Sequence, residues 1–105
     1  MTETALSVNG IPIRLTDERW SHIITQHGEL SDSRADVLTA IADPERILAG
    51  QGGELIAARR VAVGKWLVVV YREGNDDGFI ITAFLTRRRR WLEDRIVVWS
   101  RSKNI

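Results

Sequence analysis

Three β-type segments joined by short turns constrain the fold of this chain more than any other feature. They span residues 54–61, 65–72 and 78–86, and each contains β-branched side chains. Ala62-Val63-Gly64 and the stretch from Gly74 to Gly78 supply turn residues between them. Because turns this short connect neighbouring antiparallel strands, the three segments predict a β-meander.

Two helices are predicted before this meander. In the first, an apolar stripe recurs with helical spacing and ends at His27, after which Gly28 stops the helix. The second helix ends at Asp43, because a residue that precedes proline is pushed out of the helical region. The residues that can cap the two helices are Thr16 or Asp17 and Ser31 or Asp32.

Together these elements predict an α+β domain with two N-terminal helices packed on an antiparallel sheet of about four strands. Alternating apolar residues over 11–15 add a short strand ahead of the helices, and Ile47 with Leu48 adds a lead-in to the meander. The last segment has both helical spacing and a β-branched run at 96–99, and we favour a strand or extended tail there. The length of 105 residues and the apolar fraction of 44% fit a single domain over 1–105.

The composition argues against several protein classes. The chain has no cysteine, which excludes disulfides and thiolate metal sites and agrees with a cytoplasmic location. The first nine residues carry neither the basic nor the apolar part of a secretion signal, and the longest apolar run, Trp66 to Tyr71, is far too short to span a membrane. No membrane partner is therefore expected.

Charge is divided unequally along the chain. Residues 1–58 carry four basic and nine acidic residues, a net charge of −5, whereas residues 59–105 carry 11 basic and five acidic residues, a net charge of +6. A polyanion such as RNA, or an acidic protein, would be attracted to the C-terminal part. The alternative is a lopsided surface that is simply solvated.

Familiar catalytic motifs are missing. No glycine-rich loop has the lysine and hydroxyl pair that binds nucleotide phosphates, and no serine stands in a nucleophile elbow. His22 and His27 are five residues apart, so on a helix they point in different directions and do not converge on one metal ion. Neither a metal site nor a cofactor is expected.

The remaining candidates for chemistry are one histidine, several cations and two hydroxyls on the sheet. His27 ends the apolar stripe of its helix, so its ring should face the sheet, although such an imidazole can also simply bind the last helical carbonyls. Thr82 and Thr86 should share a sheet face with Ile80 and Phe84. The run Arg87 to Arg90 suits either phosphate attraction, which needs no fixed geometry, or a solvated patch.

Three segments of the chain, in this order, resemble the BECR-fold nucleases, the phage-barnase-EndoU-colicin-RelE-like family. They are HIITQHGEL at 22–30, DPERI at 43–47 and IITAF at 80–84. The resemblance covers residues 11–87 in the order of elements. It implies two helices followed by a curved antiparallel sheet, as in barnase and RelE.

The resemblance also implies a metal-independent endoribonuclease, as in toxins of toxin–antitoxin or phage-related systems, that cleaves RNA by 2′-hydroxyl attack and leaves a 2′,3′-cyclic phosphate. An imidazole can accept and donate a proton around neutral pH, so His27 is the first candidate for acid or base. Arg60 and Lys65 would stabilise the phosphate charge, and Thr82 would orient the phosphate or the 2′-hydroxyl. The substrate-binding candidates are Arg59, Tyr71 as a base-stacking ring, Thr86, Arg87 and Arg88. The implied partners are RNA and an acidic antitoxin or immunity protein.

Two non-catalytic alternatives stay open at this point. A domain of the same fold could bind a partner protein through its basic face, since fold does not determine chemistry. A plain RNA-binding module would instead contact phosphates and bases through Arg87 to Arg90 and through Trp91 or Trp99.

Overall fold

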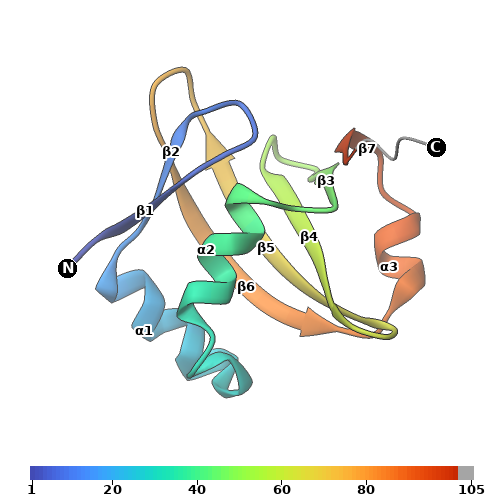
Figure 1. Cartoon of the computed structure of the whole chain (residues 1–105), viewed down its shortest axis with the longest axis horizontal. Helices are drawn as coiled ribbons and strands as arrows, with labels where there is room; N and C mark the ends of the chain where they lie inside the picture. The colour runs from blue at the N-terminus through green and yellow to red at the C-terminus, as the bar shows by residue number, and fades with distance from the viewer. Residues whose placement is uncertain (102–105) are drawn as a thin grey trace.

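In a computed structural model, which describes residues 1–101, the chain forms one β-sheet with helices packed on both faces (Figure 1). The strands are β1 (Glu3–Leu6), β2 (Pro12–Leu15), β3 (Arg46–Ala49), β4 (Leu55–Ala62), β5 (Lys65–Glu73), β6 (Gly78–Thr86) and β7 (Val97–Ser100). The helices are α1 (Asp17–Gln26), the 3-10 turn η1 (Gly28–Leu30), α2 (Arg34–Ala42) and α3 (Arg89–Glu93). Figure 1 shows α1 and α2 together and α3 apart from them, at the right.

The strands lie in the order β1-β2-β6-β5-β4-β3-β7. All neighbouring strands are antiparallel except β2 and β6, which run parallel. The predicted meander is confirmed as β4, β5 and β6, and the predicted early strand is confirmed as β2. The β-branched run near the end of the chain forms β7, which pairs with β3.

The predicted fold, two N-terminal helices packed on an antiparallel sheet of about four strands, is wrong. Two strands come before the first helix, the sheet has seven strands, and the parallel pair makes it mixed. A third helix, α3, was not predicted. The strands β1, β2, β3 and β7 have four residues each, and β1, which was not predicted, shows too little periodicity to be found from sequence.

The helix ends follow local hydrogen bonds. Thr16 caps α1 as predicted, because its Oγ1 accepts a hydrogen bond from the Arg19 amide at 3.0 Å. The predicted caps of the second helix are wrong, since α2 begins after Ser33 and has no side-chain cap bond. Ser31, one of those predicted caps, instead donates its hydroxyl to the Gly28 carbonyl at 2.7 Å and closes η1.

Strand β5 divides the apolar interior into two parts. Leu67 and Val69 pack with the buried faces of α1 and α2 in the larger cluster. Val68 points to the other face, where it packs with Leu48 and with Leu92 of α3 in a second, smaller cluster. Alternate residues of one strand are therefore covered by different helices, because side chains alternate across a sheet.

A bulge in β6 changes which residues share a face. Val70 pairs with Thr82, but the next residue, Tyr71, pairs with Ile80, so Ile81 is an extra residue in β6. Ile80 therefore lies in the larger cluster, whereas Phe84 packs against the smaller one. The prediction that Thr82 and Thr86 share a face with Phe84 is confirmed, but it is wrong for Ile80, because it assumed a regular strand.

Within residues 1–101, no helix has the length and the apolar character that crossing a membrane requires.

Replacing Gly78 by alanine should destabilise the fold. Gly78 lies where β2, β6 and β5 meet, and a Cβ there would overlap the Arg72 carbonyl oxygen and lie 2.6 Å from Ile13 Cδ1. Because the Arg72 oxygen belongs to the backbone of the adjacent strand, we expect Gly78→Ala to lower the free energy of unfolding by about 1–3 kcal/mol in urea titration.

Gly28→Ala is the matched control for this prediction. A Cβ at residue 28 would meet nothing within 4 Å, so the change should stay within about 0.5 kcal/mol. Equal stability of the two variants would contradict the close approach of β2, β5 and β6 at Gly78.

Candidate functional site

A groove of about 840 Å³ opens between α3 and one end of the sheet. Its charged lining consists of Arg46, Arg60, Arg87, Arg89 and Arg101, with Glu45 and Glu93 as the two acids. Trp66 and Leu92 are among the apolar residues of the lining. The groove, called the arginine groove from here on, therefore combines an excess of positive charge with an aromatic side chain.

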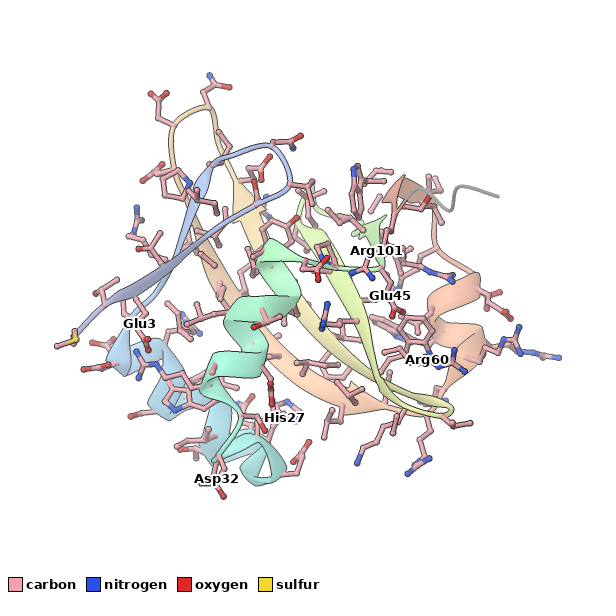
Figure 2. The ribbon with its side chains drawn as sticks, viewed as in Figure 1. Glu3, His27, Asp32, Glu45, Arg60 and Arg101 are labelled. Carbon is pink, nitrogen blue, oxygen red and sulfur yellow. The ribbon has the colours of Figure 1, made fainter. Side chains whose placement is uncertain are left out.

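The register of three strands places one row of this site. Arg60 of β4 pairs with Trp66 of β5, and Trp66 pairs with Thr86 of β6. Directly paired residues of antiparallel strands point to the same face, so the three side chains lie side by side. Figure 2 shows Arg60 beside α3, with Glu45 and Arg101 close by in the same view.

The five arginines differ in how far their charge is already used. Arg89 Nε lies 2.8 Å from Glu93, and Arg101 Nη2 lies 2.5 Å from Asp43, so both take part in ion pairs. The Arg46 guanidinium lies over the Trp66 ring, 5.3 Å from its centroid. Within residues 1–101, Arg46, Arg60 and Arg87 have no ion pair, and Arg60 and Arg87 also lie over no aromatic ring, which leaves their charges free for an anionic ligand.

Glu45 is a carboxylate of the groove with a fixed position. Its Oε2 accepts a hydrogen bond from the Arg60 backbone amide at 3.3 Å. Glu93, the other acid of the lining, is paired with Arg89. Glu45 is therefore the better placed of the two acids to accept a proton from a ligand bound beside Arg60.

His27, the predicted acid or base, lies outside the lining of the groove. It follows α1, and its Nδ1 lies 3.8 Å from Glu29 Oε2. Its ring lies 5.9 Å from the Phe84 ring, which in turn makes an edge contact with Trp91 of α3. Figure 2 shows His27 and Arg60 well separated in the view. The histidine does face the sheet as predicted, but the structure does not bring it into the arginine groove.

The other predicted cations and Thr86 lie at different places, and only some of them reach the groove. Arg59 binds Asp43, with 3.0 Å between Nη1 and Oδ2. Lys65 precedes Trp66 in β5, so it points to the opposite face from the groove. Thr86 Oγ1 accepts a hydrogen bond from the Arg88 amide at 3.0 Å and thereby fixes the turn into α3. Arg87 lines the groove as a substrate-binding candidate should, whereas Arg88 does not.

The last two predicted residues lie on the strands away from the groove. Thr82 pairs with Val70 and is not part of the lining. Tyr71 is fully buried, with 0% of its side-chain surface exposed, so it offers no ring for a base to stack on. Burial raises the pKa of the Tyr71 phenol above its usual value, and the nearby charge of Glu73 raises it further.

Sequence reasoning missed much of the groove lining, including Glu45, Arg46, Trp66 and Arg101. Trp66 could have been found, because a hairpin that turns at residues 62–64 sets residues 60 and 66 opposite one another. The others could not, since they reach the groove through the pairing of β3 with β4 and β7.

Among residues 1–101, no group of three or more histidine, cysteine, aspartate or glutamate side chains has an arrangement that could hold a metal ion.

The burial of Tyr71 predicts a stability change at high pH. The unfolded chain loses the phenolic proton above about pH 10, whereas the folded chain keeps it, so the free energy of unfolding should fall by about 1.4 kcal/mol per pH unit above that value. Tyr71 is the only tyrosine, so its phenolate absorbance reports this proton directly.

Urea titration of the wild type and of Tyr71→Phe across this pH range checks the prediction. Tyr71→Phe should show a flatter decline, because it has no proton to lose. Phenolate absorbance in the folded protein near pH 10 would show that the ring is accessible to water.

Comparisons with known protein families, with curated proteins and with solved structures found no match to this chain.

Proposed function

We propose that this chain is a metal-independent endoribonuclease that holds the RNA backbone in the arginine groove. The observation that carries this proposal is the lining of that groove, in which five arginines face two carboxylates and a tryptophan. Guanidinium groups bind phosphates with paired hydrogen bonds, and the unpaired charges of Arg60 and Arg87 suit this role.

In the proposed reaction, the ribose 2′-oxygen attacks the adjacent phosphorus and forms a 2′,3′-cyclic phosphate. The bond from phosphorus to the 5′-oxygen breaks, and that oxygen leaves as a hydroxyl after taking up a proton from solvent water, while the base later returns the proton of the 2′-hydroxyl to the solvent. A base must accept the proton of the 2′-hydroxyl, and a cation must stabilise the extra negative charge of the crowded phosphate. Arg60 and Arg87 would supply the cation.

Two groups compete for the role of base. Glu45 lies in the groove and is held beside the backbone of Arg60. His27 carries the family resemblance but lies outside the groove. We favour Glu45, because a base has to reach the 2′-hydroxyl of a nucleotide whose phosphate is bound by the arginines.

The position of His27 favours a second candidate function, a non-catalytic domain that binds RNA or an acidic protein. Such a domain needs the charge of the groove but no acid or base. An acidic antitoxin or immunity protein would compete with RNA for the same arginines. For either function we propose a cytoplasmic location, supported by the absence of cysteine from the chain.

The proposal predicts cleavage of RNA in the presence of EDTA, with 2′,3′-cyclic phosphate ends on the products. Arg60→Gln should lower the cleavage rate by about 10²–10³-fold, because it removes one charge from the phosphate site. It should also reduce the salt dependence of RNA binding, with the slope of log K against log salt falling by about 0.7. Product ends are read by mass spectrometry, and binding is measured by fluorescence anisotropy.

Arg19→Gln is the matched control, since Arg19 is an exposed arginine of α1, on the other side of the sheet from the groove. It should leave both the rate and the slope unchanged. Glu45→Gln and His27→Ala, tested in the same assay, identify the base by which of them loses cleavage and keeps binding. Intact RNA with a folded wild-type protein that still binds would reject the nuclease and favour the non-catalytic domain.

A further inference from the structure

Trp66 is the tryptophan of the arginine groove, and its surroundings differ from those of the other three. Trp20 is 8% exposed and belongs to the larger core cluster. Trp91 and Trp99 are partly buried and do not line the groove. Trp66 also lies beneath a guanidinium, that of Arg46, as Trp20 and Trp91 do beneath Arg34 and Arg95, and it packs against the smaller core cluster. It differs from the other three because it is partly exposed and lines the groove.

The neighbours of Trp66 place it beside the phosphate contacts. It pairs with Arg60, which within residues 1–101 has neither an ion pair nor a contact with an aromatic ring. Arg87 is free in the same sense, and it follows Thr86, which pairs with Trp66 on its other side. An indole with free cations on both sides suits a nucleotide, because the base needs an aromatic surface and the phosphates need positive charge.

The contact between Arg46 and Trp66 adds a second planar group to this surface. A guanidinium is weakly hydrated and stacks on aromatic rings, so the pair holds the indole in place without covering it with an apolar side chain. Such a pair can stack with any nucleobase, since every base has a π-face. In a double helix these faces are covered by the neighbouring base pairs, so only an unpaired base can use them.

We propose that Trp66 and Arg46 form a subsite for one unpaired nucleobase, so that the groove selects single-stranded RNA or loops over duplexes. This inference rests on the proposed function, because it assumes that the groove binds RNA. It adds a base contact to a site that otherwise recognises only backbone charge.

The test compares two short 2′-O-methyl oligonucleotides of equal length and charge, one with uracil bases and one without bases. The 2′-O-methyl group removes the attacking hydroxyl, so binding is measured without cleavage. The wild type should bind the oligonucleotide with bases about tenfold more tightly than the abasic one. Trp66→Leu should reduce this ratio to about one while the affinity for the abasic oligonucleotide stays unchanged.

Trp99→Leu is the matched control, because Trp99 is also partly buried but does not line the groove. It should keep the wild-type ratio. Trp66→Tyr keeps an aromatic ring and should retain most of the preference, which covers the case in which Trp66→Leu does not fold. In the wild type, photo-crosslinking of an oligonucleotide with 5-iodouracil should label Trp66, and a label on Trp91 or Trp99 instead would overturn the subsite.

The outcomes separate this inference from the proposed function. Equal binding of the two oligonucleotides by the wild type, lost in Arg60→Gln, would overturn the base subsite and leave the groove as a backbone site. Binding of neither oligonucleotide by a folded wild type would overturn both the subsite and RNA binding by the groove. A preference for bases that survives in Trp66→Leu would place the base contact elsewhere and overturn the subsite alone.

Discussion

Burial of β5 on both of its faces is the constraint on which the rest of the structure depends. Residues 66–71 are apolar at every position, which is the pattern of a strand covered on two sides and not of one with a solvated face. The helices α1 and α2 cover one face, so the chain needs a second cover, and α3 supplies it through Leu92. This second cover is short, and beyond it the exposed end of the sheet forms the floor of the arginine groove.

The sequence predicted those parts of the fold that depend on local signals. The meander was found because its turns are short and its strands are long, and α1 was found because Thr16 caps it and Gly28 follows it. The two-sided burial of β5 was missed, although the continuous apolar run in the sequence indicates it. The parallel pairing of β2 with β6 has no local signal, since two helices and the strands β3, β4 and β5 separate the two strands along the chain.

Prediction of the candidate site was less successful, for reasons that the structure makes plain. Arg60 and Arg87 were identified by charge and lie in the groove, but Tyr71 was placed by residue type alone and is buried in the core. Lys65 and Trp66 are adjacent in sequence and point to opposite faces, so choosing the lysine meant choosing the wrong side of the sheet. A site prediction for this chain therefore requires knowing which part of the sheet is exposed to solvent. The position of α3 on the sheet decides this.

The bond between Arg101 and Asp43, together with the pairing of β3 with β7, ties the arginine groove to the smaller core cluster. Leu48 of β3 and Leu92 of α3 meet in that cluster, while Arg46 of β3 and Glu93 of α3 line the groove. The same two elements therefore cover part of the apolar interior and hold the charged side chains in place. A change that loosens α3 or β3 would expose apolar surface and move the arginines apart at the same time, so the groove cannot widen without a loss of stability.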